Sequence, residues 1–207
     1  MLALYDHPVS SNALKVRFLL AELGLEYERR EVPITRPRPQ WYVDINPLTG
    51  IPTLEDGELV LSESNSILRY LANRERRDDL YPAEPAARAR IDMMLDRFSL
   101  TLRPAFFAVE RLALGFTPEG GFGSGPADPQ AARAKAEEVA PTIRLLENLV
   151  GDDGSWLGGF TIADVAAAPA LYRTTHTGMD MSPYPRLERM RDALIARPAF
   201  QAAGPVL

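Results

Sequence analysis

The spacing of apolar residues predicts a small mixed sheet in the first third of the chain. The run Leu2–Tyr5 is short and apolar, as in a buried strand, and apolar residues then repeat at helical spacing from Val16 until Gly24. From Tyr27 to Val32 polar and apolar residues alternate, which predicts a second strand. Strand, helix and strand within about 30 residues form a βαβ unit, so the two strands are expected to pair in parallel.

The next segment completes this first domain. A short helix is expected from Pro39 to Ile45, with the proline in its first turn. Asp56-Gly57-Glu58 separates two apolar runs, which is typical of a β-hairpin. A helix capped within Ser62–Ser66 follows. Residues 1–76 are therefore expected to form one mixed α/β domain, followed by a charged, proline-containing linker at 77–86.

The remainder of the chain, residues 87–207, predicts an all-helical domain because its apolar residues repeat at helical spacing and no convincing strand appears. The expected helices are Ala86 to about Leu114 with an interruption at Pro104, Ala131–Leu149, Thr161 to about Thr174, and Tyr184–Ile195. The glycine- and proline-rich segment Gly115–Gln130 is longer than most connections. It is interpreted either as a mobile surface loop or as a flap over a substrate pocket.

Composition excludes several classes of function. The net charge of −5 is spread over the chain with no basic block, so no nucleic-acid partner is expected. No apolar run reaches 18 residues, so no membrane span is expected. The absence of cysteine excludes disulfides, thiolate metal sites and a cysteine nucleophile, and with only His7 and His176 no metal is expected. The first residues lack the basic region of a signal peptide, which favours a cytoplasmic protein.

Three polar segments are candidates for a binding site. Ile51-Pro52 enters a strand, either as a cis peptide bond that leaves the Ile51 amide and carbonyl free or as an ordinary trans proline. Glu63 and Ser64 lie at a helix start, where free N–H groups favour an anion and Glu63 can pair with an ammonium group. The alternative there is simple capping.

The third segment is Ser10, Ser11 and Asn12, where the first strand ends and the first helix begins. Ligands usually bind at this edge of a parallel α/β unit, and a hydroxyl beside helix N–H groups can stabilise a thiolate. The alternative is again a helix cap. Two other polar groups are interpreted as structural: Thr161 and Asp164 resemble a capping box, and Tyr5 follows the pattern of a core residue.

In this order, the motifs resemble those of cytosolic-type glutathione S-transferases of the bacterial, serine type. The resemblance covers essentially the whole chain. The motifs that carry it are Leu4-Tyr5-Asp6-His7-Pro8 through Ser10, Asn46-Pro47 through Ile51-Pro52, Glu63-Ser64, and Phe160-Thr161-Ile162-Ala163-Asp164. It implies a thioredoxin-like, glutathione-binding domain at 1–76 and an all-α domain at 87–207 that contributes the pocket for the electrophile.

The resemblance also implies roles for the candidate residues. Ile51, before Pro52, is expected to pair its backbone with the cysteinyl part of glutathione, while Glu63 and Ser64 hold the γ-glutamyl end. Ser10 is expected to donate a hydrogen bond to the sulfur, with Ser11 and Asn12 as close competitors. The co-substrate glutathione would then attack a small hydrophobic electrophile as a thiolate, in a detoxification reaction without a metal.

One residue departs from the family pattern. The family often has a Lys or Gln where this chain has Gly50, and that side chain meets the glycine end of glutathione. Arg36, Arg38 or Trp41 are the candidates to replace it. The resemblance further implies a homodimer formed by the helices next to the linker. It leaves two alternatives open: a glutathione-dependent peroxidase, disulfide reductase or isomerase, and a non-catalytic binding or regulatory protein with the same fold.

Overall fold

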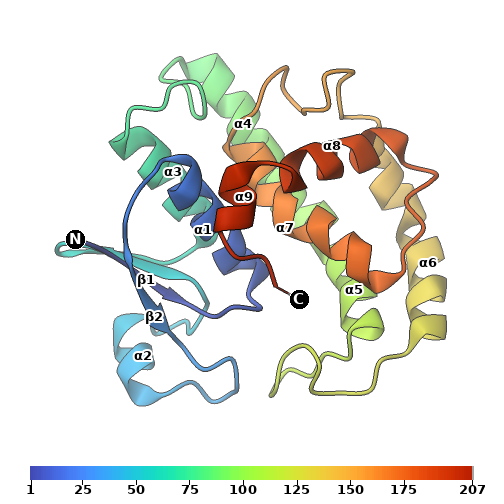
Figure 1. Cartoon of the computed structure of the whole chain (residues 1–207), viewed down its shortest axis with the longest axis horizontal. Coiled ribbons are helices and arrows are strands. Elements are labelled where there is room, and N and C mark those ends of the chain that lie inside the picture. The colour runs from blue at the N-terminus through green and yellow to red at the C-terminus, as the bar shows by residue number, and fades with distance from the viewer. Residues whose placement is uncertain (207) are drawn as a thin grey trace.

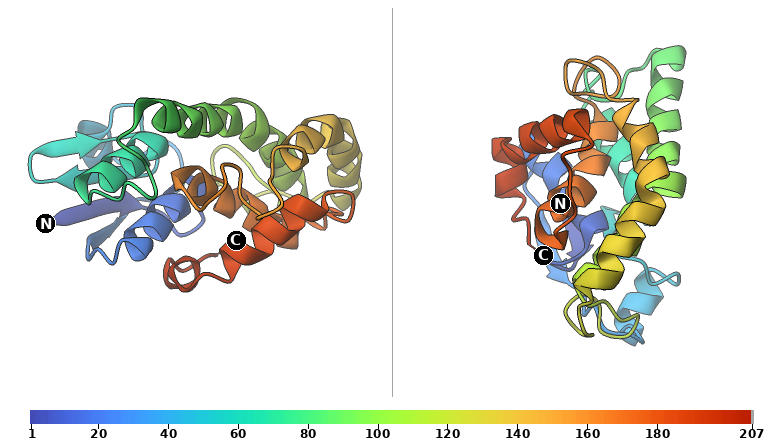
Figure 2. Two further views of the ribbon diagram at one scale, coloured as in Figure 1. Left: turned by 90° about the horizontal axis from the view of Figure 1, so that it is seen from above. Right: turned by 90° about the vertical axis from the view of Figure 1, so that its right-hand side faces the viewer.

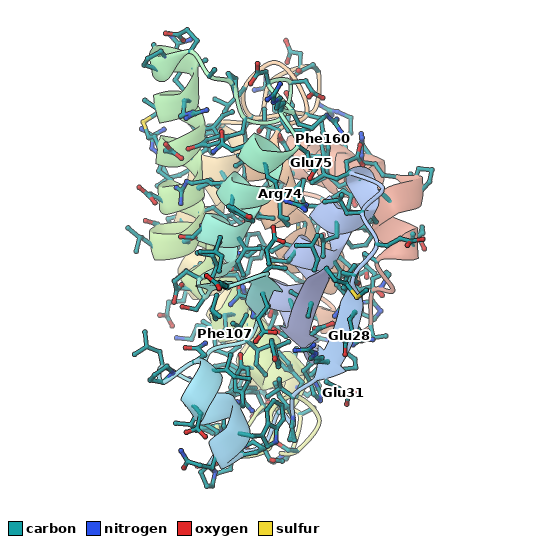
Figure 3. The ribbon with its side chains drawn as sticks, turned by 90° about the vertical axis from the view of Figure 1, so that its left-hand side faces the viewer. Glu28, Glu31, Arg74, Glu75, Phe107 and Phe160 are labelled. Atoms are coloured by element: carbon teal, nitrogen blue, oxygen red, sulfur yellow. The ribbon has the colours of Figure 1, made fainter. Side chains whose placement is uncertain are left out.

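A computed structural model describes residues 1–206 and confirms an α/β N-terminal domain followed by a helical domain (Figure 1). The N-terminal domain is built on a four-stranded sheet with the order β2-β1-β3-β4. The strands are β1 (Leu2–Asp6), β2 (Glu28–Glu31), β3 (Thr53–Asp56) and β4 (Leu59–Leu61). β1 pairs in parallel with β2 and antiparallel with β3, and β3 and β4 form the expected hairpin. Glu28 and Glu31 mark the β2 edge in Figure 3.

The two faces of the sheet pack against different helices. Leu2 and Leu4 belong to the large core that also contains residues of α1 (Ser11–Glu22) and α3 (Ser64–Arg74). Because side chains alternate along a strand, Tyr5 points to the other face. There it packs with Val32 and with Tyr42 of α2 (Gln40–Ile45). The Tyr5 hydroxyl donates to Glu55 and accepts from Arg30, so its interpretation as a core residue is confirmed.

Helix α1 has the expected signals at both ends. Ser10 is the N-cap, and its hydroxyl oxygen accepts a hydrogen bond from the Ala13 amide at 3.2 Å. At the other end Gly24 adopts a φ of 65°, and the Leu25 amide donates to the Leu20 carbonyl at 2.9 Å. This left-handed glycine with a backward bond is a Schellman motif, and it ends the helix at the glycine where the helical spacing stops.

The second domain is helical, and its helices continue the core of the first. Its elements are α4 (Pro85–Arg97), the π-helical segment η1 (Phe98–Leu102), α5 (Arg103–Ala113), α6 (Pro129–Glu147), α7 (Ile162–Thr177), α8 (Pro185–Ile195) and α9 (Pro198–Ala202). Seen from above, the sheet lies at one end of the molecule and α6 at the other (Figure 2). The short helix α9 was not predicted, because five residues are too few to show a period.

The helix interruption expected at Pro104 takes the form of a π-helical turn between two α-helices. A proline inside a helix lacks an N–H and its ring meets the carbonyl four residues earlier. Here the Arg103 amide donates to the Phe98 carbonyl, five residues back, so α4, η1 and α5 follow one another without a loop. The π-helix is rare and occurs mostly as single turns of this kind inside α-helices.

Helix α7 joins the two domains. It packs against α1, α3, α4, α5 and α8, and almost every residue from Ile162 to Thr174 is buried. It begins with the predicted capping box. The Thr161 oxygen accepts from the Ala163 amide at 3.2 Å, and the Asp164 carboxylate accepts from the Thr161 amide at 2.8 Å and its hydroxyl at 2.9 Å. Burial raises the pKa of Asp164 to about 6, against the opposing effect of these hydrogen bonds.

A buried ion pair ties the end of β1 to α1. Asp6 is fully buried and accepts both Nη1 hydrogen bonds of Arg17, at 2.8 and 2.7 Å. The Arg17 Nε also donates to the Ala203 carbonyl at 2.8 Å. The guanidinium therefore connects the first strand, the first helix and the turn that follows α9.

We expect Asp164→Ala to lower the free energy of unfolding by about 2–3 kcal/mol, because it leaves the buried Thr161 amide and hydroxyl without an acceptor. The matched control is Asp128→Ala. Asp128 caps α6 through the Ala131 amide but is exposed. That change should cost about 1 kcal/mol. Urea unfolding of both variants measures the difference, and equal losses would contradict a special role of the buried capping box.

Candidate functional site

A cavity of about 160 Å³ lies where the end of β1 and the start of α1 meet the helical domain. All three residues expected to contact a thiol line it. Its walls are formed by Val9, Ser10, Ser11, Asn12, Ile34, Arg103, Phe107, Phe116, Gly121, Phe122 and Arg173. The site is thus assembled from both domains, as expected for a pocket whose far wall is helical.

Ser10 connects the start of α1 with the loop before β3. The Ile51–Pro52 bond is cis, which is the first of the two alternatives that the sequence left open. The Ser10 hydroxyl lies 3.5 Å from the Ile51 carbonyl, to which it donates. Ile51 precedes the first β3 residue, Thr53, so its backbone takes no part in the sheet ladder. Ser10, which lines the cavity, therefore lies beside a stretch of backbone that is not paired in the sheet.

Ser11 and Asn12 differ from Ser10 in their surroundings. The Ser11 hydroxyl accepts a hydrogen bond from Arg103 Nη2 at 3.1 Å, so it is held by the helical domain. Asn12 is exposed, and its side chain makes no hydrogen bond to another residue within 1–206. Of the three, Ser10 has the hydroxyl nearest to the Ile51 backbone.

Helix α3 begins within the expected segment Ser62–Ser66, but no side chain caps it. The N-cap is Glu63, with a φ of 67° and no side-chain hydrogen bond to the helix. A non-glycine residue in this left-handed region is uncommon and is often found at functional sites. The Ile67 amide bonds to the Glu63 carbonyl, but no side chain of the described part of the chain caps the amides before it. Ser64 is buried at this open helix end.

A buried lysine that the sequence interpretation missed lies beside this helix end. Lys15 of α1 is 5% exposed, and its ammonium donates to Asn65 Oδ1 of α3 at 2.8 Å. Burial lowers the pKa of Lys15 to about 7, with a further lowering by Arg103 and Arg69 and an opposing effect of Glu63. Its signal in the sequence is a lysine inside an apolar helical run, in a chain with only two lysines.

The segment around Gly50 is held from two sides. The Gly50 carbonyl accepts from the Tyr42 hydroxyl and from Asn46 Nδ2. Arg36 Nη1 donates to Thr49 Oγ1 at 3.2 Å, and Arg38 Nε donates to the Thr49 carbonyl at 3.4 Å. Two cationic side chains therefore lie next to the position where the family often has a long polar residue. The third candidate, Trp41, is half exposed and packs against Tyr5 and Tyr42.

Two arginines that line the cavity, and a glutamate that lies behind them, were also missed. Glu110 is buried, and its carboxylate accepts from Arg173 Nη1 at 3.2 Å and from Arg103 Nη1 and Nη2 at 3.3 and 3.1 Å. Arg173 Nη2 donates to the Val9 carbonyl. Burial lowers the pKa of Arg173, against the attraction of Glu110. The detectable signal is a charged residue in an apolar run at helical spacing: Glu110 after Phe106-Phe107-Ala108-Val109, and Arg173 late in α7.

The remaining wall is aromatic and includes the long loop between α5 and α6. Phe116 and Phe122 come from this loop and contact Phe107 of α5, with ring centroids 5.2 and 5.9 Å from it. Phe106, by contrast, is a core residue. The loop also reaches the first domain, because the Arg36 amide donates to the Glu119 carbonyl at 3.0 Å. Its position supports the interpretation as a cover over a pocket.

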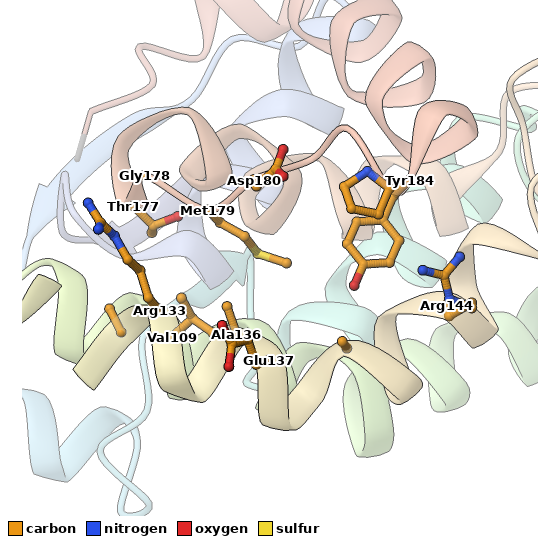
Figure 4. Close-up of a pocket in the computed structure, with 13 residues that line it drawn as sticks. Val109, Arg133, Ala136, Glu137, Arg144, Thr177, Gly178, Met179, Asp180 and Tyr184 are labelled. Atoms are coloured by element: carbon orange, nitrogen blue, oxygen red, sulfur yellow. The ribbon is translucent and has the colours of Figure 1, made fainter. Parts of the chain in front are cut away.

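Other candidate features lie apart from this cavity. His7 and His176 are absent from its lining, and burial lowers the pKa of His7. Residues 1–206 hold no group of three or more His, Cys, Asp or Glu placed to bind a metal ion. No helix of the described chain is long and apolar enough to cross a membrane. A second cavity of about 440 Å³ lies between α6 and the connection from α7 to α8, beside Met179 and Tyr184 (Figure 4).

Comparisons with known proteins agree with this architecture. The family described as "Glutathione S-transferase, N-terminal domain" matches residues 1–73, and "Glutathione S-transferase, C-terminal domain" matches residues 129–192. Glutathione S-transferase GstB of Escherichia coli is 31% identical over 97% of this chain and 96% of its own. A maleylacetoacetate isomerase of Pseudomonas aeruginosa is 29% identical over 98% of this chain and 95% of its own. The structure of a theta class glutathione S-transferase from Xanthomonas axonopodis pv. citri, with glutathione bound, has a TM-score of 0.83 at 25% identity and covers 100% of this chain and 98% of its own.

The low pKa of Lys15 predicts a pH-dependent stability. In the unfolded chain the ammonium keeps its proton up to about pH 10.4, whereas the folded protein releases it near pH 7. Between these values the unfolded state binds more protons, so the free energy of unfolding gains about 1 kcal/mol per pH unit from this residue. The loss of stability that comes from burying the charged ammonium is fully present below pH 7.

Urea unfolding at pH 7, 8 and 9 measures this effect. The wild type should gain stability with pH relative to Lys15→Met. The control is Lys135→Met, which removes the only other lysine, a half-exposed residue paired with Glu138. That variant should follow the wild type. Parallel curves for all three proteins would show that Lys15 keeps an ordinary pKa.

Proposed function

Because this chain belongs to the glutathione S-transferase family, we propose that its cavity beside Ser10 ionises the thiol of bound glutathione. The chain is a glutathione transferase with a thioredoxin-like first domain. The observation that carries the proposal is the contact between the Ser10 hydroxyl and the Ile51 carbonyl, because it brings a hydrogen-bond donor to the backbone that would bind the cysteinyl residue. Glutathione supplies the sulfur, which suits a chain without cysteine.

The γ-glutamyl end of glutathione would bind at the start of α3. Its carboxylate would accept from the open amides and the Ser64 hydroxyl, where the helix dipole favours negative charge. Its ammonium would pair with the exposed carboxylate of Glu63. Lys15 lies behind the same helix end and adds positive charge when protonated. These groups together suit a zwitterionic head group.

The middle and the glycine end of glutathione would follow the loop before β3. The cysteinyl residue would form backbone hydrogen bonds with Ile51, beside Pro52, as one further short strand. The glycine carboxylate would lie toward Gly50, where no side chain is available. Arg36 and Arg38, which both contact Thr49, are the donors we assign to it. A guanidinium matches a carboxylate in geometry and charge.

Ser10 is the residue we assign to the sulfur. A free thiol has a pKa of about 8.5 and is mostly protonated at neutral pH. Lowering it by about two units requires roughly 2.7 kcal/mol of preferential thiolate stabilisation. One charge-assisted hydrogen bond and the N-terminus of α1 are together sufficient for this. The thiolate then attacks an electrophile that rests on the aromatic wall of Phe107, Phe116 and Phe122.

An isomerase that uses the same bound glutathione is the second candidate, supported by the relatives of this chain that are named maleylacetoacetate isomerases. Transferase and isomerase would share the glutathione site and differ in what the activated sulfur meets. Parallel assays with a halo-nitroarene and with a cis-dienoic keto acid separate them. If calorimetry detects no binding of glutathione at millimolar concentration, this chain would instead be a non-catalytic member of the fold.

We expect Ser10→Ala to raise the pH at which bound thiolate forms by about one to two units, because the sulfur loses its hydrogen bond. Ultraviolet absorbance of the thiolate and the pH profile of kcat/KM both measure this shift. Ser11→Ala is the matched control, since its hydroxyl is taken by Arg103. An unchanged titration in Ser10→Ala, or a shift in Ser11→Ala instead, would remove Ser10 from the mechanism.

We also propose a homodimer formed through α4, the helix that follows the linker. Its exposed apolar side chains support this: Met93 is 43% exposed, and Leu100 in the following η1 is 78% exposed. Asp96 and Arg97 flank them in the same shallow hollow. Such large exposed apolar residues close together are typical of an interaction surface.

Sedimentation should therefore give twice the chain mass of 22.9 kDa. Leu100→Glu should shift the equilibrium to the monomer, since it would place a charge in the apolar contact. Leu145→Glu provides a control, because Leu145 is 60% exposed on α6, outside this surface. A wild type that sediments only as a monomer would contradict the proposal.

A further inference from the structure

We propose that the second cavity, between α6 and the connection from α7 to α8, is a binding site for an amphiphilic carboxylate with an aliphatic chain. Its volume of about 440 Å³ lies within the range of about 300–1,000 Å³ that is typical of small-molecule sites. It shares no lining residue with the cavity beside Ser10. The proposal therefore concerns a site apart from that of glutathione, and it does not rest on the proposed function.

A tyrosine hydroxyl that has no hydrogen-bond partner among residues 1–206 points into this cavity. It belongs to Tyr184, the N-cap of α8, which is 4% exposed. In Figure 4 the hydroxyl points across the cavity toward α6. Buried polar groups are hydrogen-bonded in most proteins. The partner of this hydroxyl therefore has to come from the cavity.

The end of the cavity at this hydroxyl carries a positive charge. The Cζ atom of Arg144 lies 5.4 Å from the centroid of the Tyr184 ring, and Figure 4 shows both side chains at the same end of the cavity. The nearest acidic residue along α6 is Glu147, but its carboxylate accepts from the amides of Arg186 and Leu187, both at 2.9 Å. A guanidinium and a hydroxyl side by side supply a charged and a neutral donor to one carboxylate.

Two carboxylates also line the cavity, but neither cancels the charge of Arg144. Glu137 lies four residues after Arg133 on α6, so these two opposite charges offset each other at the other end. Asp180 accepts from the Ser182 amide at 2.9 Å, which lowers the pKa of Asp180. Figure 4 shows its carboxylate pointing away from α6. The cavity therefore favours a single anionic group, placed at the Arg144 end.

The floor of the cavity is apolar. Ala132, Ala136 and Ala140 occupy every fourth position of α6, so they lie on one face of the helix. Val109 of α5 and Met179 of the connection continue the same surface. Alanine methyl groups leave room that larger side chains would fill, and methionine adapts to what it contacts. An aliphatic chain attached to the carboxylate therefore has an apolar surface along α6.

Octanoate and octanamide provide a test, because they share one chain and differ in charge. Calorimetry should give a Kd for octanoate below about 1 mM and a Kd for octanamide at least about tenfold higher. Tyr184→Phe removes the hydroxyl and keeps the ring, so it should weaken octanoate by about tenfold. Its Tm should not fall, because the hydroxyl has no partner within residues 1–206 to lose. Arg144→Gln should bring the two Kd values within about twofold of each other.

Matched variants on α6 locate the site. Arg133→Gln should keep the preference for octanoate that Arg144→Gln loses, because Glu137 already offsets the charge of Arg133. Ala136→Leu fills the floor and should abolish the binding of octanoate. Ala134→Leu, at an exposed position outside the cavity, should leave it unchanged. Equal affinity of the wild type for the two compounds, or equal losses in the two leucine variants, would overturn the inference.

A competition measurement separates this site from the cavity beside Ser10. The probe is S-hexylglutathione, whose alkyl chain would fill that cavity. Because the two cavities share no lining residue, saturation with this probe should leave the Kd for octanoate unchanged. If the probe displaces octanoate, the inference is wrong and the proposed function stands. If octanoate binds with the expected preference to a protein that binds no glutathione, the inference stands and the proposed function is wrong.

Discussion

The buried carboxylate of Glu110 is the constraint on which the site depends. A buried charge is costly unless it is paired and hydrogen-bonded, so Glu110 fixes the positions of Arg103 and Arg173. The same two guanidiniums reach Ser11 and the Val9 carbonyl, the residues on either side of Ser10. The helical domain therefore sets the conformation of a loop that belongs to the first domain.

The chemistry at Ser10 consequently depends on contacts from three directions. The helix start gives the residue its place as N-cap of α1, the loop before β3 brings the Ile51 carbonyl to its hydroxyl, and the helical domain holds its neighbours. Under the proposed function Ser10 would serve both folding and catalysis, because the oxygen that caps the helix is the one that would meet the sulfur. Any change at this position acts on both.

Local signals were sufficient for most of the fold and for part of the site. Gly24, the Asp56-Gly57 turn and the pair Thr161–Asp164 act within a few residues, so their effects can be predicted from neighbouring residues. The residues around Pro52 allowed either a cis or a trans bond, and the structure has the cis form. Arg103, Arg173 and Lys15 could not be predicted as parts of the site, because their partners are distant in sequence: Arg103 meets Ser11 across 92 positions. The N-cap of α3 falls within the predicted segment Ser62–Ser66, but the positive φ of Glu63 and the lack of a side-chain cap there were not predicted.

The loop between α5 and α6 is fastened mainly by its main chain. The amides of Gly123, Gly125 and Asp128 donate to carbonyls at Leu114, Gly115 and Leu112. These bonds use main-chain atoms only, and the side chains of Thr117 and Ser124 add further hydrogen bonds within the loop. Phe116 and Phe122 are therefore positions at which a substitution can change the shape of the cavity while the main-chain hydrogen bonds of the loop remain possible.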